Sequence, residues 1–117
     1  MNEQKVNQQK SLQGLAQGDL SMLSALQSLI ESSYKDSGLD PQTFVLVRMA
    51  ALATLDAAPA SWLMNIEVSG EAGLAPEQIL GMLIALAPVI GTARIVSAAA
   101  NIIKAFELSE ALAEDGA

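Results

Sequence analysis

The 117-residue chain contains no cysteine and no histidine. The absence of cysteine excludes disulfide bonds, thiolate nucleophiles, thiol redox centres and cysteine-based zinc or iron–sulfur sites. The absence of histidine removes the usual general base at neutral pH and the commonest metal ligand. We therefore expect no metal and no cofactor, so that any chemistry must rest on carboxylates, Lys, Arg, Tyr34, hydroxyls or amides.

Basic and aromatic residues are also scarce. The chain has 6 Lys and Arg against 13 Asp and Glu, and only 3% of its residues are aromatic. A formal net charge of −7 disfavours contact with a phosphate backbone, so nucleic acid is not an expected partner. The N-terminal residues hold no apolar run behind their lysines, which argues against a secretory signal and makes the cytoplasm the expected compartment.

Aliphatic residues and alanine fill the chain instead, and hydrophobic residues make up 51% of it. Alanine at this density favours helices, because it loses no side-chain entropy in them. Capping positions followed by proline occur at Asp40 and Ala75, and Gly38 and Gly73 stand at expected helix ends. These signals predict an all-α bundle of about five helices, at about 19–36, 41–56, 60–72, 76–87 and 91–112.

Further predictions concern the ends of the helices. Asp19 is the expected N-cap of the first helix, and Pro88 with Gly91 is expected to interrupt the chain after the fourth. Ala75 cannot accept a capping hydrogen bond, but Gln78 can reach back to its backbone. The predicted organisation is a polar mobile tail over 1–18, a single helical domain over 19–113 and a frayed acidic tail over 114–117.

The segment from Gln78 to Ile103 contains a single charged residue, Arg94. Pro88, Gly91 and Arg94 divide it, so no part of it reaches the roughly 18 apolar residues of a membrane span, and no membrane partner is expected. A monomer of this length has too little interior for two helices without a polar face. We therefore expect a homo-oligomer.

Two short motifs connect the chain with a known family. The first is AGLAPEQI at residues 72–79, and the second is APVIG at residues 87–91. Together with the proline-started apolar helix before them and the alanine-rich helix after them, they make residues 39–106 resemble the carboxymuconolactone decarboxylase family, and within it the alkylhydroperoxidase-D-like proteins. The resemblance implies an all-α subunit that assembles into trimers or hexamers.

The resemblance also assigns positions to the missing redox residues. Redox members carry Cys-x-x-Cys, with a histidine four residues after the second cysteine, and these positions fall here on Ala58, Ser61 and Asn65. A glutamate one helix earlier would fall near Leu46. A serine hydroxyl cannot cycle through a sulfenic acid or a disulfide, so peroxidase activity is not expected. Lactone-decarboxylating members use the same histidine position, so Asn65 argues against that activity as well.

Two readings remain open for the cluster Ser61, Trp62 and Asn65. It forms part of a small-molecule pocket, with Ser61 and Asn65 as hydrogen-bonding groups and Trp62 as a wall. Alternatively, Ser61 caps the helix locally and Trp62 packs in an interface.

Arg48 and Arg94 are each the lone cation of an apolar helix. A buried arginine needs a carboxylate or several carbonyls. One reading makes them the binding groups for a small carboxylate in the candidate pocket, which would include Leu46. The other makes them structural ion-pair partners of Asp56, Glu67 or Glu77.

The leading functional hypothesis is an oligomer of this family without peroxidase chemistry, which binds a small molecule or acts structurally. One alternative is a cofactor-free decarboxylase or lactone-processing enzyme, in which Arg48 or Arg94 holds a carboxylate and Asp56, Glu67 or Glu71 is the base. The other alternative is an oligomer whose role is purely protein interaction. Glu67 and Glu71 are four residues apart on one helix, which is more typical of a solvated face than of a cation site.

Overall fold

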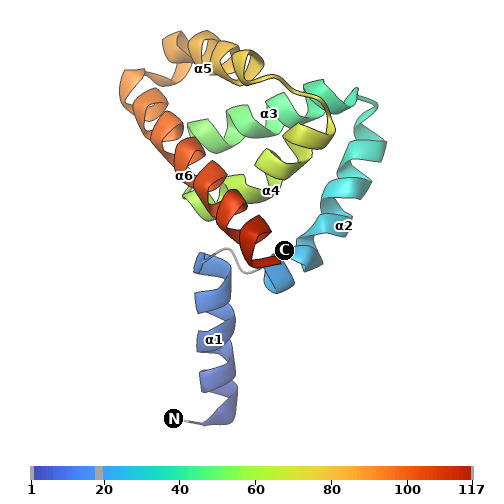
Figure 1. The fold of residues 1–117 in the computed structure, drawn as a ribbon, viewed down its shortest axis with the longest axis vertical. Coiled ribbons are helices and arrows are strands. Elements are labelled where there is room, and N and C mark those ends of the chain that lie inside the picture. The colour runs from blue at the N-terminus through green and yellow to red at the C-terminus, as the bar shows by residue number, and fades with distance from the viewer. Residues whose placement is uncertain (1, 18–19, 117) are drawn as a thin grey trace. The chain divides into compact units, whose positions relative to one another are not determined.

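The structure is a computed structural model that describes residues 2–17 and 20–116. The described residues form six α-helices (Figure 1), which confirms the all-α fold class. Contacts group the chain into two units, residues 1–38 and 39–117. The boundary between these units lies inside the segment 19–113 that the sequence assigns to one domain.

The first unit contains α1 (Glu3–Gln17) and α2 (Leu20–Ser37), which contact each other. Helix α1 is a sixth helix that the sequence did not predict, and it lies within residues 1–18, for which a polar mobile tail is expected. The segment is built mainly from Gln, Lys, Glu and Leu, which are good helix formers, although it lacks the apolar periodicity on which the prediction relied. The expected N-cap, Asp19, lies outside the described residues.

The second unit contains the other four helices. They are α3 (Pro41–Thr54), α4 (Pro59–Glu71), α5 (Pro76–Ile90) and α6 (Thr92–Gly116). Three of them begin at a proline, whose fixed φ suits the first helical position. Each of these starts agrees with the predicted one within a residue.

Helix α5 continues through Pro88 and ends at Gly91, which has a φ of 92°. The predicted end near residue 87 is therefore too early. Proline removes one backbone donor and crowds the preceding turn. In α5 it stands in the last turn and is exposed, so only one helical hydrogen bond is lost there. The actual end coincides with the glycine, whose positive φ other residues rarely adopt.

Helix α6 continues to Gly116, which corrects the predicted helix end at 112 and extends the helix into the acidic segment expected over 114–117. Glu110, Ala111, Leu112, Ala113 and Glu114 are residues of good helix propensity, and they prolong the helix beyond its apolar part. Ala117 lies outside the described residues.

The core of the second unit lies where α3 and α4 pack against α6, with α5 closing over α3 (Figure 1). Its fully buried side chains include Met49 from α3 and Trp62 from α4. These two side chains belong to one buried cluster, which also includes residues of α3, α4, α5 and α6 and of the turn before α5: Val45, Ala53, Ile66, Leu74, Ile79, Leu83, Ala98, Ile102 and Ala105. In the described part of the chain, no helix has the length and apolarity needed to cross a membrane.

Gln42 fixes the start of α3 against the turn between α4 and α5. Its Nε2 donates to the carbonyl of Ala72 at 3.2 Å, and its Oε1 accepts from Gln78 Nε2 at 3.1 Å. Gln78 Oε1 in turn accepts from the backbone N–H of Ala75 at 2.8 Å. The predicted reach of Gln78 back to Ala75 is thus confirmed, and it is part of a connection between three helices.

We expect Ala75→Ser to raise the free energy of unfolding by about 1 kcal/mol. Ala75 has the extended backbone of an N-cap, with φ −78° and ψ 150°, and its side chain forms no capping bond. A serine hydroxyl in this place can accept one of the free N–H groups of the first turn. Urea denaturation measures the gain. Ala100→Ser, at an exposed position inside α6, is the control and should show no gain, whereas an equal gain there would contradict the capping explanation.

Asp40 gives a pH-dependent prediction. A bond from the Thr43 hydroxyl to Asp40 Oδ1 at 2.6 Å, with a second from Thr43 N–H to Oδ2 at 3.2 Å, lowers the pKa of this carboxyl below its ordinary 3.8. A lowered pKa in the folded state stabilises the fold above the ordinary value, and this stabilisation is lost as the pH falls through the lowered value.

Asp40→Ala should therefore lower the melting temperature at pH 7, and the difference from the parent should shrink as the pH falls below about 3.8. Melting curves recorded by circular dichroism between pH 2 and 7 test this. A difference that stays constant over the whole range would mean that the charge of Asp40 plays no part in the cap.

Candidate functional site

Arg48 and Asn65 form a polar pair between α3 and α4. Arg48 Nε donates to Asn65 Oδ1 at 3.0 Å. Asn65 is 6% exposed, so its amide is buried in the packing between helices, while Arg48 is half-buried. Asn65 Nδ2 also donates to the carbonyl of Ser61 at 3.5 Å, one turn earlier in α4. The amide is therefore held from both sides, and it fixes the orientation of the guanidinium.

Arg48 also lies over an aromatic ring. Its guanidinium carbon is 5.4 Å from the centroid of the Phe44 ring, within the range of a cation–π contact. The two residues are four apart on α3, which is the spacing that brings side chains together on a helix. In the described part of the chain, the partners of Arg48 are thus a neutral amide and an aromatic ring, and neither carries a negative charge.

The other residues of the expected pocket have different roles in the structure from Arg48 and Asn65. Ser61 is exposed and contributes only its backbone carbonyl to the pair, and Ala58 is the N-cap of α4. Leu46 is half-buried and packs against the core. Trp62 is fully buried, and its Nε1 donates to the carbonyl of Ala57 at 3.2 Å. Trp62 therefore belongs to the core of the unit.

Arg94 lies apart from this pair. Its Nη1 donates to the carbonyl of Thr54 at 2.9 Å, at the C-terminal end of α3. Thr54 is six residues beyond Arg48, or roughly 9 Å along the helix axis. Arg94 is exposed, so it connects α6 to the end of α3 and does not join Arg48 and Asn65.

Each of the three acidic candidates is exposed. Asp56 lies in the turn after α3 with a φ of 54°, and it accepts a hydrogen bond from the Ser97 hydroxyl of α6. Aspartate tolerates this left-handed conformation better than most residues. Glu67 and Glu71 lie on the exposed side of α4. Among residues 2–17 and 20–116, no three acidic side chains gather into a group suited to a metal ion.

The sequence singled out Arg48 and Asn65 separately, without indicating that they touch. It missed Phe44, for which the spacing of four residues from Arg48 was the available signal. It also missed the bond between Asp56 and Ser97, which are 41 positions apart, because no local pattern connects residues at that separation.

Comparison with known families gives a match over most of the chain. The sequence model of the carboxymuconolactone decarboxylase family matches residues 21–105. The chain belongs to this family. No curated protein and no solved structure matches the chain. The part matched by the carboxymuconolactone decarboxylase family extends from α2 into α6, so it includes Phe44, Arg48 and Asn65.

Proposed function

We propose that this member of the carboxymuconolactone decarboxylase family binds a small carboxylate through Arg48, as a cytoplasmic homo-oligomer that does not use peroxidase chemistry. The observation that carries the proposal is the half-buried side chain of Arg48, whose guanidinium is oriented by a neutral amide rather than by a carboxylate. The family resemblance suggests a trimer or a hexamer.

The geometry of Arg48 supports an anionic ligand. Guanidinium has five N–H donors, and Asn65 accepts from the Nε of Arg48. The two Nη nitrogens form a second edge, which matches the two oxygens of a carboxylate. Because the neighbouring amide and ring bring no negative charge, a bound carboxylate would meet the full positive charge of Arg48.

The replaced redox positions support the exclusion of peroxidase chemistry. The methyl group of Ala58 and the hydroxyl of Ser61 stand where the resemblance places the two cysteines, and neither can form a sulfenic acid or a disulfide. We expect no turnover in an assay of peroxide reduction with a dithiol donor. Turnover above that of a heat-inactivated sample would contradict this part of the proposal.

Isothermal titration with benzoate and with benzamide tests the ligand class. The two probes have the same ring, but only benzoate carries a charge. We expect binding of benzoate and none of benzamide. Arg48→Lys keeps the positive charge but replaces the planar guanidinium, with its two parallel donors, by a single ammonium group. It should therefore weaken benzoate binding about tenfold, which corresponds to the loss of one charge-assisted hydrogen bond.

The matched control is Arg94→Lys, which makes the same change at the other arginine in the apolar part of the chain. It should leave benzoate binding unchanged. Equal binding of benzoate and benzamide would argue against a carboxylate site, and equal weakening by both variants would argue against Arg48 as its place.

A further inference from the structure

The candidate site contains a single positive charge, that of Arg48. No other charged residue occurs over 41–55, and none occurs over 57–66, which includes the first half of α4. The next charges along the chain are those of Asp40 and Asp56, eight residues from Arg48 on either side, and both are negative. A ligand that binds Arg48 therefore meets one cation, without a second one in the adjoining parts of α3 and α4.

The contacts of Arg48 leave one edge of its guanidinium open. Asn65 Oδ1 accepts from the Nε, and the ring of Phe44 lies against a face of the guanidinium. Among the described residues, Nη1 and Nη2 of Arg48 have no hydrogen-bond partner. The two nitrogens form one planar edge with parallel donors, which accommodates one carboxylate group.

We propose that the ligand of Arg48 is a monocarboxylate with an uncharged body, and that the site binds dicarboxylates more weakly. The inference rests on the proposed function, because it narrows the class of carboxylate that Arg48 binds. It does not depend on the oligomeric state of the chain.

The surroundings of Arg48 on α3 favour an uncharged ligand body. Residues three and four positions away lie on the same side of a helix, and here they are Phe44, Val45, Ala51 and Leu52. All four are apolar, and of these Ala51 is exposed and Leu52 is half-buried. A second carboxylate that came to lie against them would lose water without gaining a positive partner, which is costly.

Arg94 does not supply the missing second cation. It donates to the carbonyl of Thr54, which is six residues beyond Arg48. At 3.6 residues per turn, this spacing turns α3 by about 120° beyond one full turn in the opposite sense, in addition to the rise of roughly 9 Å along the axis. A small dicarboxylate at the open edge of Arg48 thus finds no second arginine on its side of the helix.

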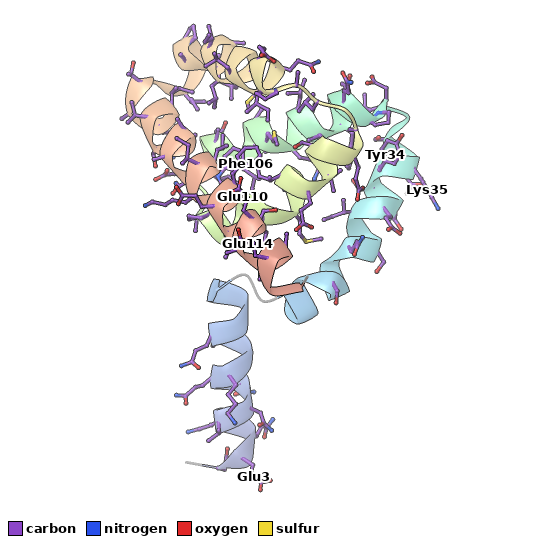
Figure 2. The ribbon with its side chains drawn as sticks, in the orientation of Figure 1. Glu3, Tyr34, Lys35, Phe106, Glu110 and Glu114 are labelled. Carbon is purple, nitrogen blue, oxygen red and sulfur yellow. The ribbon has the colours of Figure 1, made fainter. Side chains whose placement is uncertain are left out.

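The charge of the whole chain also opposes a second anionic group. The net charge is −7. In the second unit, Glu110 and Glu114 are exposed on α6, the helix that packs against α4 (Figure 2). Salt screens such charges beyond about 8 Å at physiological ionic strength, so this contribution is smaller than the missing counter-charge at the site, but it has the same sign.

Isothermal titration at pH 7 with benzoate, terephthalate and monomethyl terephthalate tests the inference. Terephthalate adds a second carboxylate at the far end of the benzoate ring, and its monomethyl ester has nearly the same length with one charge. We expect the monoester to bind like benzoate and terephthalate to bind about tenfold more weakly, because its second charge has no partner. Terephthalate binding as tight as that of the monoester would overturn the inference. Equal weakening of both would also overturn it, since length and not charge would then be the cause.

A second cation beside Arg48 should change this preference. Ala51→Lys places an ammonium group about one turn from Arg48, at an exposed position, where it can pair with the second carboxylate. We expect the affinity for terephthalate relative to benzoate to rise about tenfold, the effect of one charge-assisted hydrogen bond. Ala51→Gln adds a side chain of similar length without a charge, and this matched control should keep the ratio of the parent. An unchanged ratio in Ala51→Lys, or the same change in Ala51→Gln, would contradict the role of charge.

The outcomes separate this inference from the proposed function. Absence of benzoate binding would overturn the carboxylate site and the inference together. Benzoate binding that is weakened by Arg48→Lys, combined with equally tight binding of terephthalate, would overturn the inference alone and leave the carboxylate site in place.

Discussion

Trp62→Ala is expected to lower the free energy of unfolding by about 3–5 kcal/mol. Trp62 has no exposed surface and belongs to the core cluster shared by the helices of the second unit. Removing its indole leaves a cavity that the neighbouring side chains fill only in part, so the loss of burial and the loss of packing add. The carbonyl of Ala57 also loses the donor that Trp62 Nε1 provides at 3.2 Å, which costs more if water cannot replace it.

The measurement is urea denaturation followed by circular dichroism, because the chain has a single tryptophan and the variant therefore lacks its fluorescence. Parent and variant must be compared at one protein concentration, since association stabilises the folded state. Trp62→Phe retains most of the buried ring and should lose about 1 kcal/mol, mainly through the indole hydrogen bond. Val47→Ala, at an exposed apolar position, should change stability by less than about 0.5 kcal/mol.

A loss below about 1 kcal/mol in Trp62→Ala would contradict the place of Trp62 in the core. It would favour the reading in which this side chain is the wall of an open pocket. The size of the effect thus distinguishes a core position of Trp62 from a position in the wall of a pocket.

The helix starts were predictable because their signals are local. Proline after a capping residue at Asp40 specifies a helix start through backbone geometry alone, with no information from distant residues. The helix end at Gly73 was predictable for the same reason, because its φ of 73° after α4 depends on local backbone geometry. Periodicity was a poorer guide at both ends of the chain, because the polar helix α1 and the last turn of α6 form through propensity without an apolar stripe.

The pairing of Arg48 with Asn65 was not predictable from the sequence. The two residues are 17 positions apart on different helices, and their contact depends on how α3 and α4 pack. Residue type also pointed elsewhere, because a carboxylate is the expected partner of a partly buried arginine. The amide partner follows from the packing of the two helices, and because it carries no charge, it does not neutralise the guanidinium of Arg48.

Asn65→Asp is expected to weaken benzoate binding by about 100-fold. Aspartate has nearly the same shape as asparagine, so its carboxylate would lie where Asn65 Oδ1 lies, 3.0 Å from Arg48 Nε. A buried carboxylate at this distance neutralises the guanidinium, and opposite charges this close interact by about 4 kcal/mol where the effective dielectric constant is about 20. The ligand would then meet an ion pair in place of a free positive charge.

Isothermal titration at pH 7 measures the change, with Asn65→Leu as the control. Leucine has a similar size and no charge, so Arg48 would keep its positive charge and lose only the bond that orients it. We expect a smaller loss in Asn65→Leu than in Asn65→Asp, because the anion depends more on the charge of Arg48 than on its fixed position. Binding of benzoate by Asn65→Asp at the affinity of the parent would show that Arg48 is not the binding group. Equal losses in both variants would mean that Asn65 acts through orientation alone.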